Sequence, residues 1–104
     1  MGLGYSNRPT RRACVSFELG TVGLKYRRQV PLPVIYKDVR LECGYRMDLV
    51  VEDRLVVELK TVDRLMPVHD AQLLTYLRLS GIRTGLLLNF NSALLKDGLR
   101  RLVL

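Results

Sequence analysis

Two runs rich in β-branched and apolar residues, separated by three polar residues, constrain this chain more than any other segment. Residues 45–51 and 55–61 each have the composition of a strand, and the loop 52–54 has the length of a hairpin connection. The two runs therefore predict an antiparallel hairpin. A three-residue loop fixes its register, and in that register Asp48 lies directly opposite Glu58.

Alternation along the two strands separates their side chains into two faces. One face is uniformly apolar and is predicted to be core: Met47, Leu49, Val51, Leu55, Val57 and Leu59. The opposite face is mixed and gathers charge: Arg46, Asp48, Val50, Val56, Glu58 and Lys60. We therefore expect the hairpin to turn one side to the core and to present a charged cluster on the other.

The rest of the chain alternates strand-like and helical segments within 104 residues, a length that supports one domain spanning residues 1–104. The patterns predict a helix over 10–19, one or two edge strands within 24–38 and a short strand over 39–42. They further predict a helix over 68–80 ended by Gly81, a strand over 84–90, a helix or turn over 93–96 and a strand over 99–104. This order indicates an α/β fold with a mixed sheet.

The net charge of +7 favours a polyanionic partner such as nucleic acid. Much of the surplus is N-terminal, because residues 1–30 hold six basic groups and one acidic group. The alternative is that the basic surplus only keeps a small domain soluble. No run of apolar residues has the length of a signal peptide core or a membrane span, so we expect a cytoplasmic protein that does not enter a membrane.

The opposed carboxylates of Asp48 and Glu58 need compensation, because like charges directly across an antiparallel pair are destabilising. Lys60 lies two residues beyond Glu58 on the same face and supplies one positive charge. A hard divalent cation held by both carboxylates would compensate them better and would give the pair a chemical use. The alternative is a solvated charged face on which Arg46 and Lys60 pair with the two acids.

Three polar residues of the predicted helix over 68–80 are further candidates. Gln72 and Tyr76, spaced i and i+4, form a polar line on an otherwise apolar element. Either this line faces a site, or it marks the helix boundary with Tyr76 half-buried and its hydroxyl at the surface. His69 could act as a ligand or base, or it could cap the start of the helix.

Asp48, Glu58-Leu59-Lys60 ten residues later, and a helix carrying Gln72 and Tyr76 resemble the core of the PD-(D/E)XK nuclease superfamily, with the QxxxY helix motif of its RecB-like branch. A closer resemblance, to the GxxExxY family of small bacterial proteins, covers about three quarters of the chain. It rests on the segments RQVPLPV, YKDVRLECGYRMDLVVED, VVELKTVDRLMPVHDAQLLTYLRLSG, LLLNFN and LLKDGLRR. The resemblance implies a restriction-endonuclease-like αβββαβ core.

The same resemblance implies a metal-dependent nuclease that hydrolyses DNA phosphodiester bonds. Asp48 and Glu58 would hold Mg²⁺ or Mn²⁺, and Lys60 would complete the catalytic set by orienting or activating the attacking water. Gln72, Tyr76 and Arg46 would support the site or touch the DNA.

The N-terminal segment 1–22 departs from the family pattern. Asn7 stands where the GxxExxY motif has Glu, Thr10 stands where it has Tyr, and the first helix is expected to be shortened or degenerate. This departure keeps two alternatives open: a non-catalytic nucleic-acid-binding or assembly protein on the same fold, and a truncated reading frame with no independent role. A weakened first helix would also leave an apolar face uncovered, which favours a homo-oligomer.

Overall fold

The computed structural model describes residues 8–91 and 98–104, and within these ranges the chain forms two helices and seven strands. The elements in chain order are α1 (Arg8–Thr21), β1 (Tyr26–Pro31), β2 (Val34–Tyr36), β3 (Val39–Leu41), β4 (Arg46–Val51), β5 (Leu55–Lys60), α2 (Pro67–Ser80), β6 (Thr84–Asn89) and β7 (Leu99–Val103). The expected helix or turn over 93–96 lies outside the described residues. The first helix is present, and it extends beyond the predicted range at both ends.

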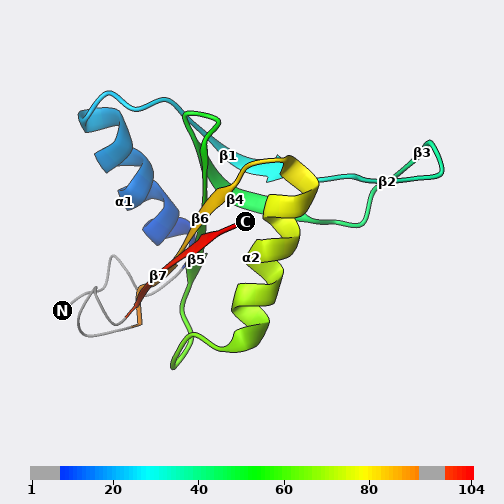
Figure 1. Cartoon of the computed structure of the whole chain (residues 1–104). Helices are drawn as coiled ribbons and strands as arrows, with labels where there is room; N and C mark the ends of the chain where they lie inside the picture. Colours follow the sequence, from blue (N-terminus) through cyan, green and yellow to red (C-terminus); the bar gives the residue numbers. More distant parts are fainter. Residues whose placement is uncertain (1–7, 92–97) are drawn as a thin grey trace.

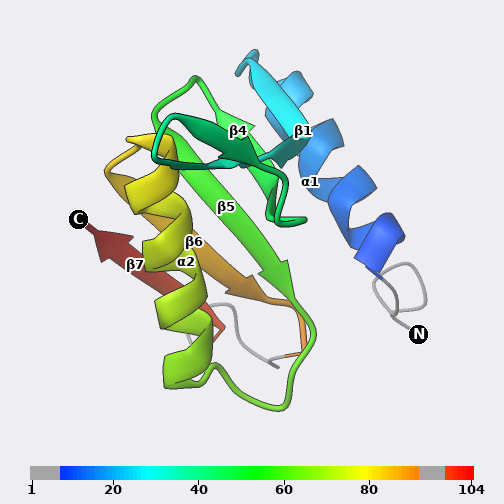
Figure 2. The same ribbon diagram turned by 90° about the vertical axis from the view of Figure 1, so that its right-hand side faces the viewer.

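Five of the strands form one mixed sheet in the order β1-β4-β5-β6-β7. The strands β5 and β6 are parallel and are joined through α2, whereas the other neighbours in the sheet are antiparallel. Figure 1 shows α1 on one face of this sheet and α2 on the other, and Figure 2 shows α2 lying across the strands. The architecture confirms the predicted α/β fold with a restriction-endonuclease-like core.

The central hairpin has the predicted register, with Val51 paired to Leu55, Val50 to Val56 and Leu49 to Val57. Its turn is closed by the Arg54 N–H, which donates to the Val51 carbonyl at 3.0 Å. Glu52 and Asp53 both have positive φ, at 52° and 55°, as the central residues of a type I′ turn do. Extended by one residue beyond the Leu49–Val57 pair, the observed register places residue 48 across from residue 58.

Both faces of the hairpin are core, and the expected division into one apolar and one charged face is therefore wrong in part. Leu49, Val51, Val57 and Leu59 form a cluster with Val15 and Leu19 of α1. The opposite face packs Val50 and Val56 against Leu73 and Leu77 of α2, and Met47 joins this second cluster rather than the first. A helix covers each face of the sheet. Asp48 and Glu58 therefore lie at one end of the packed layer between the sheet and α2.

The strands β2 and β3 form a separate two-stranded sheet that projects from the domain (Figure 1). The sequence placed this segment near a sheet edge, but only β1 joins the main sheet, where it is the edge strand. The large apolar side chains of Ile35, Tyr36 and Val39 remain 56–62% exposed on this projection. Its turn also has two non-glycine residues with positive φ, Lys37 and Asp38.

The position of α2 is fixed at both ends and in the middle. Pro67 occupies its first turn, where a missing N–H does no harm, and the Met66 N–H donates to His69 Nδ1 at 2.8 Å. Gly81 ends the helix with a φ of 77°, and its N–H donates to the Leu77 carbonyl. Between these ends, the fully buried Leu73 packs directly on Gly85 of β6.

Candidate active site

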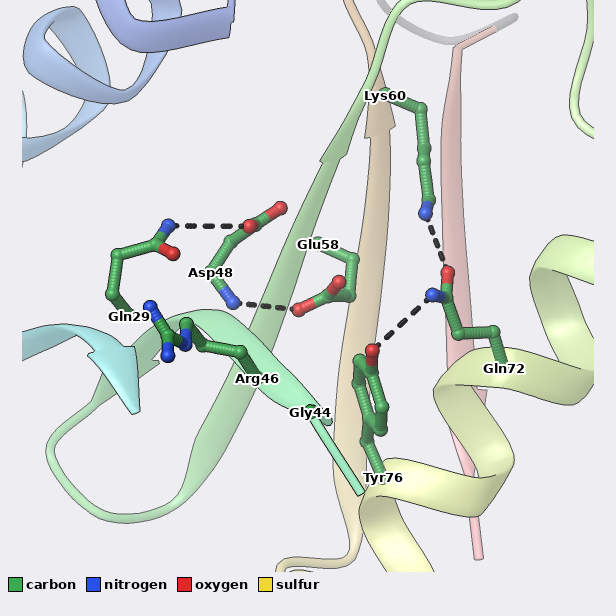
Figure 3. A pocket seen from close by; sticks show the side chains of 8 residues that line it. All are labelled: Gln29, Gly44, Arg46, Asp48, Glu58, Lys60, Gln72 and Tyr76. Atoms are coloured by element: carbon green, nitrogen blue, oxygen red, sulfur yellow. Dashed lines mark hydrogen bonds between the residues drawn. The ribbon is translucent and has the colours of Figure 1, made fainter. Parts of the chain in front are cut away.

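A polar hollow of about 250 Å³ opens between the start of β4, the end of β5 and the helix α2. Its lining residues come from four elements and from the segment before β4: Gln29, Gly44, Arg46, Asp48, Glu58, Lys60, Gln72 and Tyr76 (Figure 3). The structure therefore brings together every site candidate from the sequence except His69, and it adds Gln29 and Gly44.

Asp48 and Glu58 are buried in this hollow, with exposed fractions of 2% and 1%. Each carboxylate is held by a backbone N–H of the other's strand. The Asp48 N–H donates to Glu58 Oε2 at 2.8 Å, and the Leu59 N–H donates to Asp48 Oδ2 at 2.9 Å. Backbone donors of this kind offset part of the cost of burying a carboxylate. The alternative of a solvated charged face is wrong for these two acids, because α2 covers this side of the sheet.

A chain of hydrogen bonds connects β5 to α2. Lys60 Nζ donates to Gln72 Oε1, and Gln72 Nε2 donates to the Tyr76 hydroxyl at 3.2 Å. The i, i+4 spacing of Gln72 and Tyr76 places both side chains on the same side of α2, as expected. These contacts give the lysine ammonium a fixed position in the hollow that the two carboxylates also line.

Tyr76 lies deeper than a helix-boundary residue would. It is 6% exposed, and its hydroxyl lines the hollow instead of reaching the surface. Burial raises the pKa of Tyr76 above its ordinary value of 10.0, and the negative charge of Glu58 raises it further. Tyr76 is therefore a neutral hydrogen-bonding group at physiological pH.

Gln29 is a site residue that the sequence analysis missed. It has a φ of 52° within β1, between the pairs that Arg28 and Val30 make with β4. Its amide nitrogen lies 3.5 Å from Asp48 Oδ1. A positive φ is costly for such a residue, and strain of this kind is common where a side chain is aimed at a functional site. The only signal in the sequence is a polar residue between apolar and basic neighbours.

The remaining candidates take different positions. Arg46 lines the rim of the hollow and has an exposed side chain. His69 acts as the helix cap described above and is not among the residues that line the hollow, which confirms the capping interpretation. Thr10 lies within α1, and Asn7 lies outside the described residues.

The donor set suits a hard divalent cation. Two buried carboxylates share one polar hollow with the Gln29 amide beside them, and oxygen donors are the ligands that Mg²⁺ and Mn²⁺ prefer. Over residues 8–91 and 98–104, no group of three or more His, Cys, Asp and Glu side chains could form a metal site. A cation here would therefore depend on Asp48 and Glu58, with water or substrate completing its shell.

Comparison with known proteins agrees with this geometry. A family model described as the PD-(D/E)XK nuclease superfamily matches residues 2–102. The chain belongs to the PD-(D/E)XK nuclease superfamily. No curated protein and no solved structure gives a match. Membership of this superfamily supports a nuclease-like function and a nucleic-acid partner.

Neither of the helices in the described part of the chain is long and apolar enough to span a membrane.

Proposed function

We propose that this protein is a metal-dependent nuclease that hydrolyses phosphodiester bonds of DNA. The observation that carries the proposal is the pair of buried carboxylates, Asp48 and Glu58, in one hollow with the ammonium of Lys60. A buried pair of like charges beside a positioned lysine has a direct use in phosphoryl chemistry. The net charge of +7 is suited to a DNA partner.

In this mechanism, Asp48 and Glu58 would hold Mg²⁺ or Mn²⁺, which would polarise the scissile phosphate and lower the pKa of a water molecule. The ammonium of Lys60 orients the attacking water and stabilises charge that develops on the phosphate oxygens. A water oxygen bonds to phosphorus, the bond from phosphorus to a sugar oxygen breaks, and that oxygen takes up a proton.

The other polar residues support these three or contact the DNA. An ammonium group has three N–H donors, so the bond from Lys60 to Gln72 leaves two for water and phosphate. Tyr76 fixes the amide of Gln72, and Arg46 at the rim contacts the DNA backbone. We also propose that the chain belongs to the GxxExxY family and that it acts in the cytoplasm.

Thermal unfolding with and without Mn²⁺ tests the proposal. A cation that binds only the folded state at a hundredfold excess over its Kd adds about 2.7 kcal/mol, which raises the Tm by about 10 °C or more. Asp48→Asn should lose this response and the cleavage of DNA. Asp63→Asn makes the same chemical change at an exposed position and should keep both.

The activity arm uses Lys60→Met, which should bind Mn²⁺ normally but cleave plasmid or oligonucleotide DNA far more slowly. A wild-type Tm that ignores Mn²⁺, together with no cleavage by any variant, would contradict the proposal. Retained DNA binding under those conditions would favour a non-catalytic binding protein on the same fold.

A further inference from the structure

A second hollow of about 270 Å³ lies beside the candidate active site, between α2 and the residue that precedes β4. It is lined by Tyr45, Val68, Ala71, Gln72, Thr75 and Tyr76, and none of these side chains carries a formal charge at neutral pH. Tyr45 is 40% exposed and Val68 is 68% exposed. The Thr75 hydroxyl donates to the Ala71 carbonyl within the helix. The hollow therefore offers an apolar surface with an aromatic wall.

This apolar hollow adjoins the candidate active site. Gln72 and Tyr76 line both hollows. The chain passes from one to the other at a single peptide bond, because Gly44 lines the active-site hollow and Tyr45 lines the apolar one. Gly44 has a φ of 76°, a conformation that other residues rarely adopt, and this bend sets the direction in which Tyr45 leaves the backbone.

The Tyr45 ring packs against the ring of Tyr76 and remains partly exposed. Its centroid lies 6.1 Å from the Tyr76 ring at an interplanar angle of 60°, within the range of favourable tilted aromatic pairs. Tyr76 is itself fixed by Gln72. The exposed part of the Tyr45 ring is thus a pre-positioned surface for a second flat group.

We propose that this hollow binds an unpaired nucleobase of the strand whose phosphate lies in the candidate active site. The inference rests on the proposed function and adds the substrate class: single-stranded or locally unpaired nucleic acid. A nucleotide combines an anionic phosphate with a flat, apolar base. The charged hollow of the candidate active site suits the phosphate, and the adjoining apolar hollow suits the base. Bases stack on aromatic side chains with little regard to sequence. Within a duplex, neighbouring base pairs cover those faces and leave only the edges accessible.

Fluorescence of 2-aminopurine tests the stacking directly. The probe is a short single-stranded oligonucleotide that carries several 2-aminopurines, mixed with the full chain in EDTA so that cleavage does not occur. The wild type and Tyr45→Phe should quench the probe and bind it with similar affinity. Tyr45→Ala should lose the quenching and bind about tenfold more weakly, while its affinity for a duplex of the same sequence stays unchanged.

Two further variants test whether the effect of Tyr45→Ala is specific to this hollow. Val68→Glu places a carboxylate in the same hollow from an exposed position, so it should fold normally and also weaken single-strand binding. Tyr36→Ala removes an exposed tyrosine from the projecting β2–β3 hairpin and should change nothing if the hollow alone is responsible.

Equal quenching by the wild type and Tyr45→Ala would overturn the base-binding proposal. Tyr45-dependent binding of apolar peptides, without binding of any oligonucleotide, would also overturn it. These failures leave the Mn²⁺ response of the wild type intact, so they are distinct from failure of the nuclease proposal. Conversely, Tyr45-dependent quenching in a protein whose Tm ignores Mn²⁺ would support the base site and refute the metal site.

Discussion

Replacing Gly85 by alanine should disturb the packing of α2 on β6. A Cβ at this position would lie 2.8 Å from both δ carbons of Leu73 and 2.9 Å from its Cγ. Carbon atoms in contact normally lie about 3.5–4.0 Å apart, so Leu73 or the whole helix must move by about 1 Å. Leu73 is fully buried and adjoins Gln72, so the movement reaches the bond between Gln72 and Lys60.

The expected cost follows from two opposing terms. Overpacking of this kind destabilises by about 1–3 kcal/mol. Alanine in place of glycine restricts the unfolded chain and returns about 0.5–1 kcal/mol. The net loss of about 1–2 kcal/mol should lower the Tm by about 5–15 °C for a domain of this size.

A double-mutant cycle shows whether Leu73 is the cause. Leu73→Ala alone should cost about 2–5 kcal/mol through the cavity that it leaves. In that background the added methyl has room, so Gly85→Ala should be neutral or mildly stabilising. Gly20→Ala is the matched control, because nothing lies within 4 Å of its Cβ position, and it should raise stability slightly.

Urea unfolding followed by far-UV circular dichroism measures the free energy of unfolding of the wild type, of each single variant and of the double variant. The critical result is that Gly85→Ala loses its destabilising effect in the Leu73→Ala background. The same loss in both would refute the packing argument and would assign the role of Gly85 to its backbone alone.

Tyr76→Phe should cost about 0.5–1.5 kcal/mol near neutral pH through the lost hydrogen bond with Gln72. Because the pKa of Tyr76 is raised above 10.0 in the folded state, the wild type should lose stability as the pH rises past 10, and Tyr76→Phe should lose less in urea melts at pH 8 and 10.5. Asn89→Ala should cost about 1–3 kcal/mol in thermal melts, because the buried Asn89 amide bonds both the N–H and the carbonyl of Val62. Arg40→Ala removes an ion pair whose two side chains are 63% and 64% exposed, and its free energy of unfolding should match that of the wild type within about 0.5 kcal/mol.

The sequence was sufficient for the hairpin and for its register, because residue alternation and loop length are local properties. The same reasoning placed Asp48 opposite Glu58, and the structure brings both into one hollow. It misjudged the surroundings of the pair. Val50 and Val56 share the face of the two acids, and their burial depends on where α2 packs, which no local pattern encodes.

Gln29 shows a second limit. Its role depends on a positive φ within an edge strand, and glutamine has no marked preference for that conformation. The strain is sustained by the pairs on either side of it, Arg28 with Leu49 and Val30 with Met47. Such a position can be recognised only from the complete sheet and not from the local sequence.

The exchanged contacts between β4 and β5 have a consequence for hydrogen exchange. The amide hydrogens of Asp48 and Leu59 are held by the carboxylates of Glu58 and Asp48 rather than by backbone carbonyls. The rate at which these two amide hydrogens exchange with deuterated solvent therefore depends on whether the carboxylates keep these hydrogen bonds. Any ion or substrate that draws the carboxylate oxygens toward itself should alter the protection of these two amides in the interior of the sheet. A measurement normally used to follow unfolding would then record the occupancy of the site.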